Sequence, residues 1–488
     1  MVHSLVQDAG VAGRGRLPWP VIAGAVLYVL LLVLGDRLLN DADTYWQIAL
    51  GHWIVAHHAV PHVDTFSWTV AGKPWISSQW LAQVMFAQAF DAAGWTGVVV
   101  LTAAAIAGAC ALLMCVLQER LAPAPSLILT VGAFVLASPH MVARPHALAL
   151  PVMVAWTAGL VRACDERRAP SLWLLPLIAL WANLHGSFTF GIALIAPFAL
   201  EALLHAPREA KLAVVLRWGG FGLLALTAAC ATPYGPESIL VTLRVLGLGP
   251  ALSIIGEWQP QSFAAFGGFE LCLLAAIGFA LHRGLTLPPV RIAVVLGLLH
   301  MALSQGRNGD LLGLLAPLVI AAPLASQLGT AAPRADRGVS YVGVAVLLLA
   351  LVAASVVSPA VATYRPRAEI TPQGAVEAVK RSGKTHILNS YDFGGYLIAE
   401  GIAPFIDGRT ELYGGPFVLR HHHAVTLQDV GDFLRLLHDD GIDVTMLSPG
   451  TPAVGLLDRL AGWTRLYADD TAVVHVRNGP PAETDRLK

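Results

Sequence analysis

Residues 18–46 read PWPVIAGAVLYVLLLVLGDRLLNDADTYW. The run from 18 to 35 carries no charge and is long enough for a membrane-spanning helix. Arg14 and Arg16 precede it and no small-residue cleavage site follows, so we expect an uncleaved anchor rather than a signal peptide. Asp41 and Asp43 come directly afterwards, which places two carboxylates at the predicted membrane edge.

The composition of the whole chain agrees with this beginning. Charged residues make up 13% of 488, against about 25% in soluble domains. Hydrophobic residues reach 56% and the mean hydropathy is +0.64. These values exclude a soluble enzyme and a disordered chain, and a net charge of −1 gives no electrostatic footprint for a nucleic-acid partner. The predicted class is a polytopic α-helical membrane protein.

The charges are unevenly distributed. The 129 residues from Ala360 onward hold 13 basic and 16 acidic residues, nearly half of the total. We therefore divide the chain into a transmembrane domain, residues 1–360, and a water-soluble domain, residues 361–488. Short alternating elements predict a small α/β fold for the second domain. Its expected helices are 373–381, 427–438 and 452–460, its expected strands 385–389, 404–406 and 444–447, and its expected hairpin 466–476.

Apolar runs between charged breaks predict about eleven membrane-spanning helices. Their approximate limits are 18–35, 95–117, 126–141, 147–162, 171–184, 187–204, 212–231, 266–281, 290–305, 310–328 and 339–358. The runs 171–184 and 290–305 are short, since a 14-residue helix rises only about 21 Å in a hydrocarbon core of about 30 Å. Short spans lower the residues at their ends into a cavity, as at transporter binding sites.

The distribution of Lys and Arg predicts the orientation. Thirteen of these residues fall on the side of the membrane that holds the N-terminus, and five fall on the opposite side. This excess favours a cytoplasmic N-terminus. An odd number of spans then puts residues 361–488 outside. We expect a multi-pass protein of the bacterial inner membrane with a periplasmic or exterior C-terminal domain.

Polar residues without a topological role gather on the predicted outer side. Ionisable groups at a membrane edge are costly and usually mark a site. The candidates in the transmembrane domain are Asp41, Asp43, Arg144, His146, Asn183, His185, Glu257, Arg307 and Asn308. In the exterior domain, Asp407, Arg409 and Glu411 lie at a predicted strand end, where they could reach an acceptor, cover the site, or form a structural Asp–Arg pair.

The acidic pair has two chemical interpretations and one structural one. Residues two apart do not share a helical face, but in a turning segment both carboxylates can point into one site. There they could act as general base or hold a divalent cation such as Mg²⁺ or Mn²⁺. Alternatively Asp41 or Asp43 caps the helix that follows. That helix, with Trp46, Leu50 and Ile54, is predicted to lie in the membrane interface, as is a second over 79–92.

Each of the other candidates also has an ordinary structural interpretation. Arg144 before Pro145 can begin a span and reach lipid headgroups. His185 can end a helix, and Arg307 can pair locally with Asp310. Glu257 can anchor the chain at the interface. The run 421–423 of three histidines is interpreted as a solvated surface, because adjacent histidines rarely converge on one metal ion.

An anchor span, an acidic pair and an interfacial helix in this order resemble the beginning of the GT-C superfamily of polytopic glycosyltransferases. The segments 389–397, NSYDFGGYL, and 405–414, FIDGRTELYG, resemble the tail of bacterial membrane proteins of that type. The resemblance implies a polyprenyl-phosphate-linked sugar donor and a lipid, glycan or protein acceptor on the outer face. The pair is Asp-Ala-Asp rather than the adjacent acidic pair of the mannosyltransferases, and the Trp-Trp-Asp-Tyr-Gly signature of oligosaccharyltransferases is absent.

Transfer from such a donor needs a base for the acceptor hydroxyl and donors for the phosphate that leaves. Asp41 or Asp43 is the expected base, with inversion at the anomeric carbon. Arg144 and Arg307 are the expected phosphate ligands, since guanidinium forks fit phosphate oxygens; His146, Asn183 and His185 add hydrogen-bond donors. The alternatives are a transporter or flippase of a lipid or glycan, and a non-catalytic scaffold with an exterior binding domain.

Overall fold

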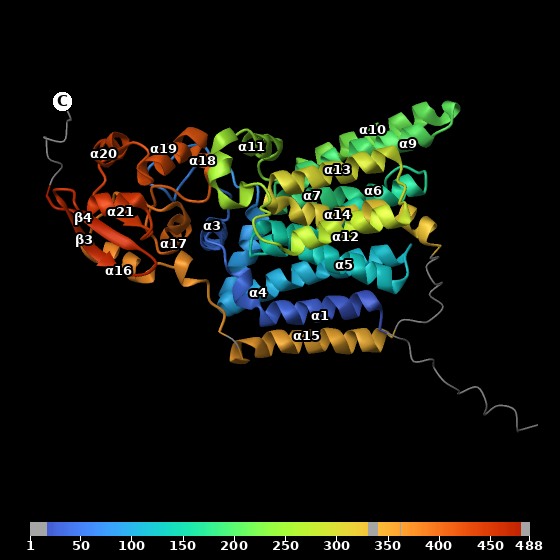
Figure 1. The fold of residues 1–488 in the computed structure, drawn as a ribbon, viewed down its shortest axis with the longest axis horizontal. Helices are drawn as coiled ribbons and strands as arrows, with labels where there is room; N and C mark the ends of the chain where they lie inside the picture. The colour runs from blue at the N-terminus through green and yellow to red at the C-terminus, as the bar shows by residue number, and fades with distance from the viewer. Residues whose placement is uncertain (1–16, 330–339, 362, 480–488) are drawn as a thin grey trace, which may run out of the picture.

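The computed structural model describes residues 17–329, 340–361 and 363–479. Figure 1 shows a bundle of helices that run roughly side by side, with a smaller domain of helices and strands against one end. We call the smaller part the C-terminal domain.

A helix lies at each of the eleven predicted spans. The bundle consists of α1 Trp19–Val33, α4 Trp80–Gln118, α5 Pro123–Ala137, α6 Pro145–Asp165, α7 Leu175–Leu184, α8 Phe188–Ala193, α9 Ile195–His205, α10 Lys211–Ala229, α12 Gly268–Arg283, α13 Pro289–Ser304, α14 Gly309–Leu328 and α15 Tyr341–Val361. Seven helical stretches among the described residues are long and apolar enough to cross a membrane. The predicted polytopic helical fold is therefore confirmed, and α7 and α13 are short as expected.

The boundary before the second span is visible in α4. Ala93 and Gly94 have non-helical backbone angles, and Gly94 has φ +57°. The helix therefore consists of a separate first section and a long apolar section, as the two predictions for 79–92 and 95–117 required. The backbone break lets the first section leave the direction of the span.

An ion-pair cluster joins four helices at the end of the bundle away from the C-terminal domain. Arg291 of α13 is 3% exposed and donates from Nε to Glu201 of α9 at 2.9 Å. It also pairs with Asp165 of α6 and donates to the carbonyl of Val319 in α14 at 3.0 Å. Buried charge is costly unless it is paired and hydrogen-bonded, and here both conditions are met. The cluster fixes the far end of the bundle.

The C-terminal domain contains a four-stranded sheet in the order β1-β2-β4-β3. The strands are β1 Ile387–Asn389, β2 Val444–Leu447, β3 Trp463–Ala468 and β4 Val473–Arg477. β1 and β2 are parallel, and the other two neighbouring pairs are antiparallel. The helices are α16 Gln373–Ser382, α17 Gly394–Ala399, α18 Thr410–Tyr413, α19 Gly415–Val425, α20 Val430–Asp439 and α21 Pro452–Leu457.

Most of the predicted elements of this domain are present, with one correction. The expected strand at 404–406 is not a strand; Phe405 instead donates its backbone N–H to the side chain of Asn389 at 2.8 Å. Side-chain pairing has replaced a strand ladder there. Helices α17, α18 and α19 were not predicted.

Helix α3, Asp43–His57, lies between the bundle and the C-terminal domain (Figure 1). Trp46, Leu50 and Ile54 belong to a buried cluster that includes Phe405 and Leu412 of the C-terminal domain. These side chains therefore pack on protein, and the position of the helix in the membrane interface stays a prediction. Protein covers the apolar face of α3, and this contact places the acidic pair at the domain junction. The remaining short helices are α2 Gly35–Leu38 and α11 Glu237–Leu246.

Candidate functional site

The acidic pair forms the start of α3. A side-chain oxygen of Asp41 accepts the backbone N–H of Asp43 at 2.8 Å, so the helix-capping interpretation holds for Asp41. The same two carboxylates also face one guanidinium, that of Arg144. The threonine next in sequence, Thr44, is buried and donates to the carbonyl of Ala143 at 3.0 Å. This bond ties α3 to the residue before Arg144 and keeps the three charges together.

Arg144 organises the carboxylates of the site. It precedes α6 in an extended conformation, and Pro145 takes the first helical position as predicted. Its Nη2 donates to Asp43 at 2.7 Å, while Nε pairs with Asp41 and Nη1 with Glu257. Nη1 and Nη2 thus donate hydrogen bonds to carboxylates, whereas Nε makes an ion-pair contact with Asp41 without a hydrogen bond. Arg144 cannot bind a phosphate as well unless it releases one of these partners.

Glu257 connects this group to a second arginine. It lies in a short 3-10 turn, Gly256–Trp258, and accepts from Nη1 of Arg307 at 2.8 Å. The Arg307 guanidinium carbon lies 4.4 Å from the ring centroid of Trp258. The expected local partner, Asp310, instead accepts the backbone N–H of Leu311 at 2.7 Å. In the part of the chain that the structure describes, Glu257 is the carboxylate paired with Arg307.

His146 and His185 lie beside each other at this end of the bundle, with ring centroids 6.0 Å apart. His146 donates from Nε2 to the carbonyl of His140 at 2.8 Å. Nδ1 of His185 accepts the backbone N–H of Ser187 at 3.2 Å, so its neutral form carries a proton on Nε2. His185 follows the last residue of α7, as the short span predicted, and can offer that proton to a ligand.

The two asparagines have structural partners. Asn183 accepts from Trp80 at 2.7 Å and donates to the carbonyls of Ala179 and Ala231 at 2.8 and 2.9 Å. Its amide is fully used in joining α7 to α4. Asn308 donates to the carbonyl of Met301 in α13 and to the side chain of Gln305. Both side chains therefore have hydrogen-bond partners within the bundle.

The C-terminal domain closes the site from the other side. A cavity of about 250 Å³ lies between residues 254–256 of the bundle, Tyr391 and Asp392 of the C-terminal domain, and helix α19. Burial raises the pKa of Asp43; Arg144 lowers it, and the carboxylates of Asp41 and Asp407 raise it further. A carboxylate with a raised pKa is a stronger base.

Sequence reasoning did not assign Tyr391 and Asp392 to the site, although both stand in the segment that carried the family resemblance. His421 of α19 also lines the cavity, is 4% exposed and bonds from Nε2 to the carbonyl of Asn389 at 2.9 Å. The prediction that all three histidines are solvated is therefore wrong for His421. Its spacing from Val418 and Val425 puts it on the buried face of α19, which is the signal that could have revealed it.

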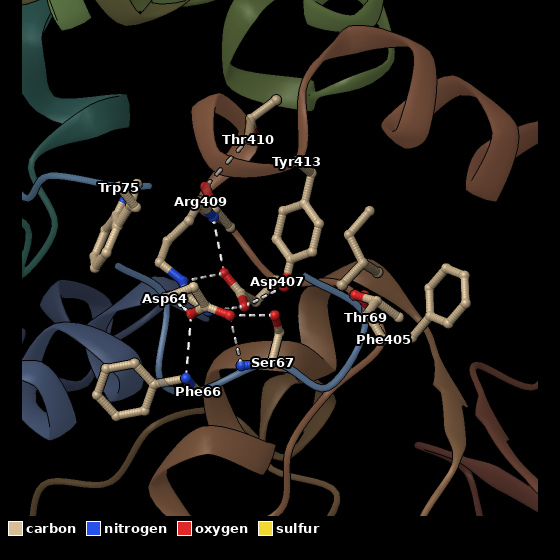
Figure 2. A network of polar contacts seen from close by, with 12 residues as sticks. Asp64, Phe66, Ser67, Thr69, Trp75, Phe405, Asp407, Arg409, Thr410 and Tyr413 are labelled. Carbon is tan, nitrogen blue, oxygen red and sulfur yellow. Dashed lines mark hydrogen bonds and ion pairs between the residues drawn. The ribbon is translucent and has the colours of Figure 1, made fainter. Parts of the chain in front are cut away.

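Asp407 and Arg409 form the predicted structural pair, in a network shown in Figure 2. Arg409 is 1% exposed and donates to Asp407 from Nε at 2.8 Å and from Nη2 at 2.6 Å. Its Nη1 donates to Asp64 of the loop after α3 at 2.5 Å. The hydroxyl of Tyr413 donates to Asp407 at 2.7 Å. The pair therefore joins the loop after α3 to the C-terminal domain.

Glu411 extends the same junction. It accepts from Nε1 of Trp75 at 2.9 Å, and burial raises its pKa. Lys73 donates to the carbonyl of Leu412 at 2.6 Å, and Thr69 donates to that of Phe405 at 2.7 Å. Glu411 thus helps to hold the loop rather than facing the cavity.

The carboxylates as arranged do not fit a divalent cation. Mg²⁺ and Mn²⁺ need several oxygen ligands around one position. Here the guanidinium of Arg144 lies between the carboxylates of Asp41 and Asp43 and occupies that position. Across residues 17–329, 340–361 and 363–479, no three His, Cys, Asp or Glu side chains are grouped to hold a metal ion.

Comparison with solved structures identifies the fold. The apo oligosaccharyltransferase of Archaeoglobus fulgidus matches with a TM-score of 0.53 at 12% identity, over 88% of this chain and 69% of that one. Mycobacterial arabinofuranosyltransferase AftD gives 0.46 at 13% identity, over 96% and 41%. ArnT from Cupriavidus metallidurans, bound to undecaprenyl phosphate, gives 0.41 at 13% identity, over 94% and 99%. No family model matches the sequence, nor does any curated protein.

The chain therefore shares the multi-pass helical fold of the oligosaccharyltransferase, and the prediction of a polytopic membrane fold of this kind is confirmed. The likeness is one of fold, since identity is low and the oligosaccharyltransferase signature is absent.

Proposed function

We propose that the protein is a membrane glycosyltransferase that moves a sugar from a polyprenyl-phosphate-linked donor to an acceptor hydroxyl. One observation carries this proposal: on a GT-C fold, Asp41, Asp43, Arg144, Glu257 and Arg307 converge at the domain junction, beside a cavity. Acid–base groups and a phosphate-binding cation are the minimum that this transfer needs.

Arg307 is the proposed ligand of the donor phosphate. One of its terminal nitrogens pairs with Glu257, which leaves the opposite side of the guanidinium for a second oxyanion. It lies in the 3-10 turn Gly306–Asn308, directly before α14. His185 can donate its Nε2 proton to the same phosphate. Both groups stabilise the negative charge that develops on the leaving phosphate.

Asp43 is the proposed general base. The acceptor O–H gives its proton to this carboxylate while the oxygen forms a bond to the anomeric carbon. The bond from that carbon to the phosphate oxygen breaks, and the electron pair leaves with the polyprenyl phosphate. Attack from the side opposite the phosphate inverts the anomeric centre. The cavity beside Tyr391 and Asp392 is the proposed entry for the acceptor, and its size suits one sugar or amino-acid side chain.

The orientation supports a reaction on the outer face. The predicted cytoplasmic loops carry Arg120, Arg162 and Arg291, and in the structure these arginines lie in ion pairs at the end of the bundle away from the site. The site and the C-terminal domain then belong to the periplasmic side of the bacterial inner membrane.

The experiment uses the full chain in nanodiscs with two probes. Binding of undecaprenyl phosphate is followed by quenching of tryptophan fluorescence, and transfer is followed with a panel of synthetic polyprenyl-phosphate sugars. We expect Arg307→Met to weaken lipid-phosphate binding at least tenfold, about 1.4 kcal/mol, while the exposed Arg244→Met has no effect. Equal binding by all three proteins would contradict the phosphate role, and the absence of transfer from every donor would contradict the enzyme.

A further inference from the structure

The turn of residues 407–409 touches the proposed base directly. A Cβ atom at Gly408 would lie 1.9 Å from one carboxylate oxygen of Asp43 and 2.6 Å from its carboxyl carbon. The carboxylate therefore occupies the space that any larger residue at position 408 would fill. The other oxygen of Asp43 pairs with Arg144 at 2.7 Å. Asp43 is held between a guanidinium of the bundle and a glycine of the C-terminal domain.

Helix α17 also packs closely against the segment that carries Asp43. A Cβ at Gly395 would lie 2.4 Å from the carbonyl oxygen of Ala42, and one at Gly394 would lie 2.3 Å from that of Ile406. The backbone of α17 thus packs against both the acidic segment and residues 404–406, which lead into the 407–409 turn. Three glycines allow an approach that side chains would prevent.

The 407–409 turn is fixed by charge on its other side. Arg409 spans Asp407 of the turn and Asp64 of the loop after α3, and its guanidinium lies 4.9 Å from the ring centroid of Trp75. Asp64 also accepts the backbone N–H groups of Phe66 and Ser67, both at 3.1 Å (Figure 2). Two carboxylates share one guanidinium, and these further donors satisfy the remaining oxygens. Such a buried and fully bonded network is rigid.

We propose that Asp64, Asp407 and Arg409 are positioning residues that hold Gly408 against the Asp43 carboxylate and so fix the orientation of the base. The inference rests on the proposed function of Asp43. In this proposal the C-terminal domain contributes to the reaction, because its residue Gly408 packs against one side of the Asp43 carboxylate. The loop after α3 holds the 407–409 turn in this position through Asp64. None of the three residues needs to touch a substrate.

The first test is Gly408→Ala with a matched control. The added methyl must move the Asp43 carboxylate by more than 1 Å to reach an ordinary contact distance, and misplacement of that size costs about a hundredfold in turnover. We expect kcat to fall about a hundredfold with KM unchanged. Gly374→Ala places a Cβ 2.1 Å from the Tyr467 hydroxyl, an equal overlap in the same domain away from the site, and is expected to leave kcat unchanged.

The second test loosens the network without removing its charge. Arg409→Lys keeps the cation but cannot span both Asp64 and Asp407. We expect a fall in kcat and faster hydrogen–deuterium exchange of the backbone over residues 40–46, in full-length protein that still elutes as a single species. A merely structural role would change exchange only in residues 62–75 and 404–413.

The exchange measurement needs no donor, so it separates two failures. If no polyprenyl-phosphate sugar is transferred by the wild type, the proposed function fails, while faster exchange over 40–46 in Gly408→Ala and Arg409→Lys still supports positioning. Unchanged exchange over 40–46 in both variants overturns the inference. An equal loss of kcat in Gly374→Ala overturns it as well.

Discussion

Replacing Arg144 with lysine tests the geometry of the site while it keeps the charge. Arginine holds Asp41, Asp43 and Glu257 with three different nitrogens, whereas the lysine ammonium is a single point charge on a flexible stem. Arg144→Lys therefore preserves the electrostatic balance and removes the fixed arrangement of the carboxylates.

The magnitude follows from the number of bonds. A hydrogen bond between charged groups contributes about 1.5–3 kcal/mol, and lysine can keep one good partner of three. Arg144 makes two hydrogen bonds, to Asp43 and Glu257, so the loss of one of them amounts to about 1.5–3 kcal/mol. If the arrangement is needed in the transition state, turnover falls by about 10 to 10², since about 1.4 kcal/mol corresponds to a factor of ten.

The assay compares kcat for sugar transfer in nanodiscs with the thermal midpoint of the same samples. A double variant with Asp41→Asn gives the coupling, because side chains that act together do not add. We expect the double variant to lose less than the sum of the single losses. Turnover within threefold of wild type in Arg144→Lys, or strict additivity, would refute the organising role of Arg144.

Three further predictions concern the same region. Asp43→Asn should lower kcat by about 10² to 10⁴ because the base is lost, whereas full activity in both Asp43→Asn and Asp41→Asn would exclude the acidic pair from the reaction. Treatment with EDTA should leave undecaprenyl phosphate binding unchanged, because Arg144 occupies the position between the two carboxylates; a loss restored by Mg²⁺ would reverse this. Burial lowers the pKa of His421 from 6.5 to about 4. The folded protein therefore favours the neutral imidazole, and this contribution to the free energy of unfolding is fully present above pH 6.5. Up to about 3 kcal/mol of it is lost as the pH falls from 6.5 through 4. The thermal midpoint of His421→Gln should lack this part of the pH dependence.

The span pattern was predictable because membrane burial acts on each segment separately. An apolar run in lipid must form a helix whatever its neighbours are, because its backbone groups can only bond to one another there. Each of the eleven predicted spans therefore contains a helix. The same local logic succeeded for β2, whose residues 444–447 are all buried. It failed at 404–406, where the partner of Phe405 is a side chain, Asn389, rather than a strand.

Pairings between distant segments could not be predicted from local pattern. Arg144 and Glu257 are 113 positions apart, and Arg409 and Asp64 are 345 apart. The sequence indicated that these residue types lacked a topological role, but not which carboxylate each arginine would meet. The contact between Gly408 and the Asp43 carboxylate could not be predicted either. A glycine in a turn looks the same in the sequence whether or not another side chain fills the space beside it.

The surroundings of the two arginines divide the site into two parts. Arg144 has a carboxylate on each nitrogen, so it stabilises the ionised acids and sets where they point. Arg307 has one carboxylate and an aromatic face, so it retains capacity for an incoming anion. Glu257 is shared by both, and a phosphate that draws Arg307 away from it would leave this carboxylate more strongly bound to Arg144. In the proposed reaction, donor binding at Arg307 would thereby be coupled to the contact between Arg144 and the proposed base, Asp43.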